Sequence, residues 1–151
     1  MRVLLLQEDI ADQFYPMICA AAQELSVGDP RLLATDIGPV IDQEARQNLE
    51  NHKATMRQSA KTFTELTAPE GGHFVAPAIY LLDNLAQLKR EVFGPILHIV
   101  RYRKDDLARV LNEVNEKGYA LTGGCHSRIR KQIDFVEKHL QCGNLKCRKK
   151  K

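Results

Sequence analysis

Residues 88–97 combine residue types that could hold part of a nucleotide. A carboxylate, Glu91, and an aromatic ring, Phe93, precede Gly94-Pro95 and then an apolar run that is typical of a buried strand. This order places one hydrogen-bond acceptor and one flat apolar surface at the mouth of a strand, where they could bind ribose hydroxyls and cover a ring. A solvated glutamate and a core phenylalanine would give the same pattern, so both interpretations stay open on the residues alone.

Cys125 is a second candidate, as a nucleophile. Two glycines precede it, and the helix N-terminus expected after it could lower the pKa of its thiol. His126 follows directly, however, and adjacent side chains of a strand point to opposite faces, which places the two badly for proton transfer. We therefore expect Cys125 to have a structural role.

The remaining thiols and imidazoles form no recognisable motif. The closest pair among the four cysteines, Cys142 and Cys147, lacks zinc or redox spacing, so we predict free thiols in a reducing compartment and no metal site. His98 lies inside an apolar run and is interpreted as a hydrogen-bonded core residue rather than a base. His73 and His126 lie near predicted turns, where a structural and a chemical role both remain open.

Hydrophobic periodicity predicts strands that alternate with helices. The expected strands cover residues 2–7, 62–66, 74–82, 96–100 and 119–124, with one more beginning at Leu145 and ended by charge. Pro77 would confine the third of these strands to an edge or a bulge. The pattern favours an α/β domain with an open, mostly parallel sheet covered by helices.

The helices needed to cover this sheet are bounded by capping residues. A first helix is expected directly after the first strand and up to Ser26, with Pro16 kinking or dividing it. A second begins after Asp42 as N-cap, and a short helical turn is expected near Leu85 and Leu88. The last two helices are expected to begin at an N-cap (Asp105 or Asp106, then Ser127) and to end at a glycine (Gly118, then Gly143).

Composition and charge limit the class of protein. With 151 residues, 44% hydrophobic and 27% charged, the chain fits one globular domain that can form a core without disulfides or a structural metal. The net charge of +3 arises from the last six residues, which carry five basic side chains, so residues 1–145 carry a net charge of −2. We therefore expect a solvated, disordered basic tail at 146–151 and no nucleic-acid partner; a polyanion-binding tail is a lesser alternative.

No apolar run approaches the ~18 residues of a membrane span. The opening run ends at Gln7, Glu8 and Asp9, too early for a signal peptide, so we predict a cytoplasmic protein without membrane association.

Residues 91–97, Glu-Val-Phe-Gly-Pro-Ile-Leu, resemble the signature of the aldehyde dehydrogenase superfamily that contacts the nicotinamide cofactor. The resemblance extends from Arg2 to Leu145 and is greatest to the delta-1-pyrroline-5-carboxylate dehydrogenase module of the proline utilization A (PutA) proteins, through residues 2–12, 35–42, 98–103, 118–122 and 143–145. It implies a partial, aldehyde dehydrogenase catalytic-domain-like fold over residues 1–145, with oxidation of glutamate semialdehyde to glutamate by NAD in the parent enzyme. It also implies that Glu91 binds the nicotinamide ribose and that Phe93 packs beside it.

The departures from this family suggest loss of activity. The family's nucleophilic cysteine precedes the strand that begins here at Arg2, its Rossmann-type domain and general-base glutamate lie further upstream, and its substrate loop follows the position of Leu145. We expect a truncated domain that is inactive alone and binds NAD weakly or not at all. Gly123 replaces a favoured Phe and Cys125 a favoured aliphatic residue; a buried cavity at Gly123 would cost about 3–5 kcal/mol.

A non-catalytic interaction protein is the alternative from another class. Apolar surface that the neighbouring domain of the full enzyme would bury favours self-association or docking onto a partner.

Overall fold

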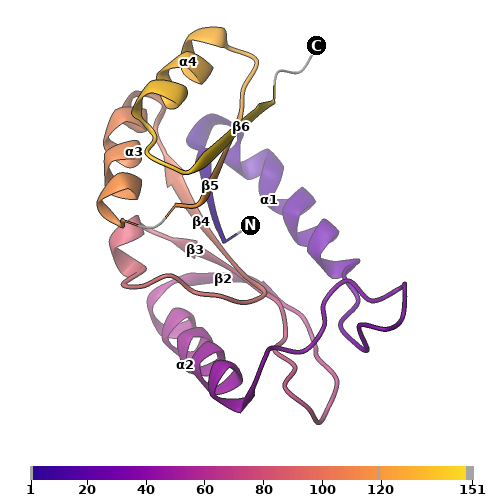
Figure 1. The fold of residues 1–151 in the computed structure, drawn as a ribbon. Helices are drawn as coiled ribbons and strands as arrows, with labels where there is room; N and C mark the ends of the chain where they lie inside the picture. Colours follow the sequence, from indigo (N-terminus) through magenta and orange to yellow (C-terminus); the bar gives the residue numbers. More distant parts are fainter. Residues whose placement is uncertain (1, 119, 149–151) are drawn as a thin grey trace. The chain divides into compact units, whose positions relative to one another are not determined.

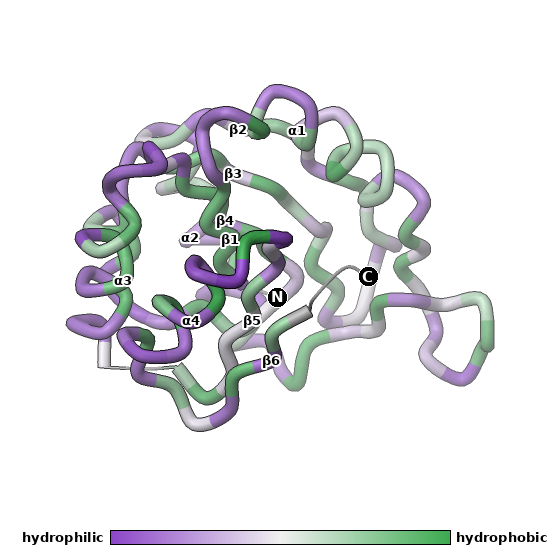
Figure 2. Tube along the Cα trace, turned by 90° about the horizontal axis from the view of Figure 1, so that it is seen from above, coloured by the Kyte–Doolittle hydropathy of each residue, from purple (hydrophilic) through white to green (hydrophobic). Residues whose placement is uncertain are grey.

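The computed structural model describes residues 2–118 and 120–148 and divides into two compact units, Met1–Arg101 and Tyr102–Lys151 (Figure 1). The first unit contains a sheet of four strands in the order β1-β4-β3-β2. Their bounds are β1 Val3–Gln7, β2 Lys61–Glu65, β3 Ala78–Leu82 and β4 Ile96–Tyr102, the last of which reaches the second unit with one residue. β3 and β4 are parallel, and β2 runs antiparallel to β3. Figure 2 shows the mostly hydrophobic composition of β3 and β4 in green.

Helix α1 (Glu8–Gln23) follows β1 without a loop, as expected. Its Ala11 and Tyr15 pack with Leu6, Ile79 and Ile99 in a buried cluster. Pro16 lies inside a single helix, so of the two predicted effects, a kink or a division, the division is wrong. Burial of the helix against the sheet offsets the hydrogen bond that proline cannot donate.

Helix α2 (Gln43–Ser59) begins at the predicted cap. The Asp42 carboxylate accepts a hydrogen bond of 2.7 Å from the backbone N–H of Ala45. The helix buries Leu49, Lys53 and Met56, so a lysine stands between two hydrophobic core residues on its inner face.

A polar network surrounds that lysine. Lys53 Nζ donates to the Ala76 carbonyl oxygen at 3.2 Å and lies 3.9 Å from the Glu65 carboxylate. Glu65 accepts two hydrogen bonds from Arg57, at 2.7 and 3.0 Å, and one from the hydroxyl of the fully buried Tyr80. The Arg57 hydrogen bond is the main cause that lowers the pKa of Glu65, whereas burial chiefly raises the pKa of Tyr80. The network joins α2, β2 and β3.

The expected edge position of the third strand is wrong. β3 begins at Ala78, after Pro77, so the proline does not interrupt the ladder and the strand lies between β4 and β2. The Pro77 carbonyl oxygen instead accepts a hydrogen bond from Leu66 N–H at 2.8 Å. The predicted turn after this strand is confirmed as the helical turn η1 (Leu85–Gln87), which Asn84 caps.

The second unit consists of η2 (Lys104–Asp106), α3 (Leu107–Glu116), β5 (Thr122–His126), α4 (Arg130–His139) and β6 (Asn144–Arg148). β5 and β6 pair in parallel, α3 packs against α4, and α4 lies against β5. Gly118, at φ 69°, ends α3 as predicted, because glycine adopts this left-handed conformation without strain. The buried hydrophobic side chains of this unit include Val110, Leu111, Ile133 and Val136.

Four local predictions in this unit need correction or fall outside the described residues. Asp106 is at the N-cap position of α3 but makes no side-chain cap. α4 begins at Arg130 with Ile129, not Ser127, at its N-cap position, and the Ser127 hydroxyl accepts a hydrogen bond from Ile129 N–H. Tyr119, the expected start of β5, lies outside the described residues, as do Lys149–Lys151. β6 continues to Arg148 because β5 offers backbone partners, so charge does not end the strand after Leu145 and residues 146–148 are not disordered.

The parallel pairings and covering helices agree with the predicted α/β class. None of the helices within the described residues is long and apolar enough to cross a bilayer.

Candidate functional site

Close packing against α2 holds the loop that carries Glu91 and Phe93. A Cβ atom on Gly94 would lie 2.7 Å from two methyl carbons of the buried Leu49, so only glycine allows this approach. The Pro95 carbonyl oxygen accepts a hydrogen bond of 3.1 Å from Ala78 N–H, which ties the end of the loop to β3. The loop is therefore fixed at the start of β4, as expected for a site at the mouth of a strand.

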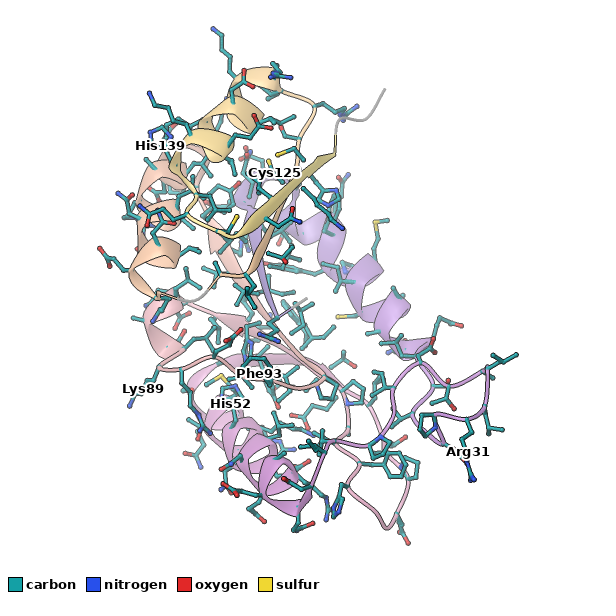
Figure 3. All side chains as sticks on the ribbon, in the orientation of Figure 1. Arg31, His52, Lys89, Phe93, Cys125 and His139 are labelled. Carbon is teal, nitrogen blue, oxygen red and sulfur yellow. The ribbon has the colours of Figure 1, made fainter. Side chains whose placement is uncertain are left out.

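Arg2 brings the two predicted site residues together. Its Nη1 donates to Glu91 Oε1, and its guanidinium carbon lies 3.7 Å from the centre of the Phe93 ring. Phe93 is 65% exposed, so the interpretation as a core phenylalanine is wrong. We call Arg2, Glu91 and Phe93 the loop cluster; Figure 3 labels Phe93 in it and His52 on α2.

Two histidines hold the backbone of Arg2. His98 Nδ1 lies 3.1 Å from the Arg2 carbonyl oxygen, which can only accept, so Nδ1 carries the proton. His98 Nε2 must then accept from His52 Nε2, 2.8 Å away. This confirms the prediction that His98 is a hydrogen-bonded core residue.

Both imidazoles favour the neutral form. Burial lowers the pKa of His98 to about 4, against the opposing effect of its hydrogen bond to Arg2. Burial and the charge of Arg90 lower the pKa of His52. The pair is thus a positioning device for Arg2 and not a base poised near neutral pH.

The loop cluster fits the ribose side of a nicotinamide cofactor. The hydrogen bond from Arg2 uses Oε1, and a carboxylate has about four lone-pair sites, so acceptor capacity remains for ribose hydroxyls. The exposed ring of Phe93 offers an apolar surface beside it. Glu91 and Phe93 would hold the cofactor, and the bound nicotinamide would supply hydride acceptance.

The thiols of Cys19 and Cys125 have pKa values above the usual value, which favours their protonated form. Burial raises the pKa of both Cys19 and Cys125, which is the opposite of an activated nucleophile. His126 is exposed on the strand that carries Cys125. Within residues 2–118 and 120–148, no group of three His, Cys, Asp or Glu side chains could hold a metal ion.

The space beside Gly123 is filled, so the expected cavity is absent there. A Cβ atom would lie 2.8 Å from a Leu140 methyl carbon and 3.1 Å from both Cys142 Sγ and a Leu145 methyl carbon. Neighbouring side chains occupy the position in which a larger residue was expected.

Sequence reasoning missed Arg2, the histidine pair and the Lys53 network. Arg2 and Glu91 are 89 residues apart, so no local spacing could signal their contact. Of the two histidines left open, His73 has a buried Nδ1 without a hydrogen-bond partner in the described part of the chain, and His126 lies on the surface. Neither of these two side chains lies in the loop cluster.

Comparisons with known proteins identify the family of the chain. The model of the aldehyde dehydrogenase family matches residues 1–151. The bifunctional protein PutA of Escherichia coli K12 is 42% identical over 153 residues, which cover 96% of this chain and 12% of that protein. The 1-pyrroline-5-carboxylate dehydrogenase of Geobacillus kaustophilus is 29% identical over 144 residues, covering 93% of this chain and 28% of that enzyme.

Solved structures show the same fold. A crystal structure of a Bradyrhizobium japonicum proline utilization A (PutA) mutant superposes with a TM-score of 0.94 at 48% identity, covering 99% of this chain and 15% of that one. The aldehyde dehydrogenase catalytic-domain-like fold and the resemblance to PutA are therefore confirmed, although the chain spans only 12% of the length of the PutA relative from Escherichia coli. The chain belongs to the aldehyde dehydrogenase family.

Proposed function

We propose that this chain supplies the nicotinamide-ribose contacts of an NAD-dependent delta-1-pyrroline-5-carboxylate dehydrogenase, which oxidises glutamate 5-semialdehyde to glutamate in proline catabolism. The observation that carries the proposal is the loop cluster, in which Arg2 holds the Glu91 carboxylate beside the exposed ring of Phe93. The names of the relatives support the substrate class, since they include PutA and 1-pyrroline-5-carboxylate dehydrogenase. A cytoplasmic location is part of the same proposal.

On its own, the chain binds the cofactor weakly and does not turn over substrate. An aldehyde dehydrogenase needs an activated thiolate to attack the aldehyde, and the environments of Cys19 and Cys125 raise their pKa values instead. The loop cluster contributes binding and orientation: Glu91 accepts the ribose hydroxyls, and Arg2 keeps the carboxylate in place.

The binding test compares Glu91→Gln with the matched control Glu70→Gln, which changes an exposed glutamate in a turn. Saturation-transfer NMR should detect NAD+ binding to the unchanged chain with a Kd of about 1 mM or weaker. The signal should fall at least about fivefold in Glu91→Gln, the loss of roughly one hydrogen bond to a charged group, and persist in Glu70→Gln. Equal signals in both variants, no signal at all, or micromolar affinity would contradict the proposal.

The activity test follows NADH absorbance with NAD+ and glutamate semialdehyde. We expect no rate above background. Turnover that disappears in Cys125→Ala would show that this thiol is a nucleophile and would overturn the assignment of inactivity.

A second candidate function, self-association without catalysis, is favoured by the surface of α1. Ile10, Phe14 and Met17 lie at helical spacing and are 39%, 41% and 64% exposed, while the opposite face of the helix packs on the sheet. Two further hydrophobic side chains of the same unit, Leu33 and Ile41, are almost fully exposed. Exposed apolar side chains that share one helix face, as on α1, are typical of a contact with a partner.

Light scattering distinguishes this candidate. Self-association predicts a mass above 17.1 kDa that rises with concentration, falls in Met17→Lys and is unchanged in Gln23→Lys, a control at the exposed last residue of the same helix, on another face. A monomer at high protein concentration would exclude it.

A further inference from the structure

Two cysteines that are far apart in the sequence face each other in the second unit. Cys125 on β5 and Cys147 on β6 are direct partners in the parallel register of the two strands. Residues in direct register point to the same side of a sheet, and the two thiols share a hydrogen bond. Figure 3 labels Cys125 on this strand pair.

The strand geometry suits a covalent link. Neighbouring strands lie roughly 4.7–4.9 Å apart. Disulfides join cysteines whose Cα atoms are about 4.4–6.8 Å apart, and this strand spacing falls within that range. Both side chains are half-buried, which leaves them accessible to a small reagent while other side chains hold them in place.

We propose that Cys125 and Cys147 form an oxidation site, a dithiol that a hydroperoxide converts into an intramolecular disulfide linking β5 to β6. The link would enclose α4 and the loops that flank it. Sequence spacing did not indicate this pair, because Cys142 is closer to Cys147 along the chain than Cys125 is.

The reaction balances with one peroxide. One thiolate attacks a peroxide oxygen, the O–O bond breaks, and a sulfenic acid and an alcohol, or water in the case of hydrogen peroxide, are formed. The second thiolate then attacks the sulfenic sulfur, the S–S bond forms, and hydroxide leaves and takes up a proton to become water. The two sulfurs lose two electrons, which reduce the O–O bond.

The surroundings keep this dithiol reduced in the absence of an oxidant. Burial, together with hydrogen bonds to Glu137 of α4 and to Cys125, raises the pKa of Cys147 to about 11. Cys125 also lies near Tyr102 and Glu137, and burial raises its pKa as well. Because the thiolate is the reactive form, oxidation should accelerate about tenfold per pH unit below these pKa values.

Cys142 could compete with Cys147 for a disulfide to Cys125. Its Sγ lies 3.1 Å from the position of a Cβ on Gly123, two residues before Cys125 on the same face of β5. A test must therefore separate a link to Cys147 from a link to Cys142. Trypsin does so, because cleavage after Lys146 places the two cysteines in different peptides.

The experiment treats the reduced full chain with hydrogen peroxide at about pH 9, where thiolate is more abundant than at neutral pH. We expect a mass loss of about 2 Da from two hydrogens, and a tryptic product that joins residues 118–128 to residues 147–148. Dithiothreitol should restore the original mass. The same treatment in guanidinium chloride should give mixed pairings, because the strand register is then lost.

Variants identify the partners. Cys125→Ser and Cys147→Ser should lose the mass change, whereas the matched controls Cys19→Ser and Cys142→Ser should keep it. A main product linked to Cys142 or Cys19, a dimer between chains, or peroxide products without any S–S bond would each overturn the proposal. The peptide map of the unchanged chain decides the matter even if a variant does not fold.

Discussion

The two units of the chain differ in how much core supports their polar side chains. Among residues 2–118 and 120–148, sixteen buried hydrophobic residues lie in Met1–Arg101 and four in Tyr102–Lys151, a fourfold difference for units that differ about twofold in length. The first unit also buries Lys53 and His98, and His98 contacts the backbone of Arg2 in the loop cluster. A rigid core thus holds the candidate cofactor contacts, whereas the second unit has less burial to stabilise it.

Breaking the Lys53 network should lower the free energy of unfolding more than any other change considered below. Glu65→Ala removes a carboxylate that Lys53, Arg57 and the Tyr80 hydroxyl share, and leaves the nearly inaccessible Lys53 ammonium group with one carboxylate, that of Glu50 at 3.7 Å, in place of two. We expect the free energy of unfolding to fall by about 3–5 kcal/mol, measured by urea denaturation. The exposed control Glu70→Ala should change it by less than about 0.5 kcal/mol. A loss below 1 kcal/mol for Glu65→Ala would mean that the network adds little to the first unit.

Oxidation of the Cys125–Cys147 pair should stabilise the second unit by about 3 kcal/mol, because the link removes conformational freedom from the unfolded chain. Hydrogen exchange can localise the gain. Amides of β5 and β6 should exchange more slowly after oxidation, while those of β3 should not change. Equal slowing in both units would contradict the view that their stabilities are separate.

Acid should destabilise the first unit through His98. The unfolded side chain, with a pKa of about 6.5, binds a proton as the pH falls, whereas the folded one resists until about 4. Stability is therefore present above pH 6.5 and lost towards pH 4, by about 2 kcal/mol between about pH 7 and pH 5.

Denaturation at the two pH values, with His98→Gln beside the exposed control His126→Gln, measures this contribution. His98→Gln should be less stable at neutral pH but flatter in its pH dependence. An unchanged slope would refute the assignment to His98.

Glycine-to-alanine substitutions, which add one methyl group, should have the smallest effects and compare the packing density of the two units. Gly94→Ala would press on Leu49 in the buried core and should cost about 2 kcal/mol. Gly123→Ala meets Leu140, which is only half-buried and can shift, so a cost of about 1 kcal/mol is expected. Gly124→Ala has only an ordinary contact of 3.9 Å and serves as the neutral control. Equal losses of stability in Gly94→Ala and Gly123→Ala would contradict the view that the first unit is more tightly packed than the second.

Some local signals in the sequence predicted the structure correctly, whereas Asp106 makes no side-chain cap on α3 and Ser127 is not the N-cap of α4. Asp42 caps α2 and Gly118 ends α3, because both act on backbone atoms within a few residues. The apolar run around His98 predicted its burial. The roles of Glu91 and Phe93 as cofactor contacts stay a prediction, made from their order before a strand and from the family resemblance.

Contacts between residues far apart in the sequence could not be predicted from local sequence patterns. The contact of Arg2 with Glu91, and the register that joins Cys125 to Cys147, depend on which strands become neighbours. The central position of β3 and the extension of β6 past its basic residues depend on the same pairing, since a strand takes its partners from the rest of the sheet. No spacing along the chain encodes these contacts.

The most direct test of the proposed cofactor contact is a residue-resolved 1H–15N NMR titration of the chain with NAD+. The account predicts shifts that concentrate at Arg2, Glu91 and Phe93, spare the β5 and β6 amides, and disappear in Glu91→Gln. Shifts confined to the second unit, or shifts around Phe93 that persist unchanged in Glu91→Gln, would contradict it.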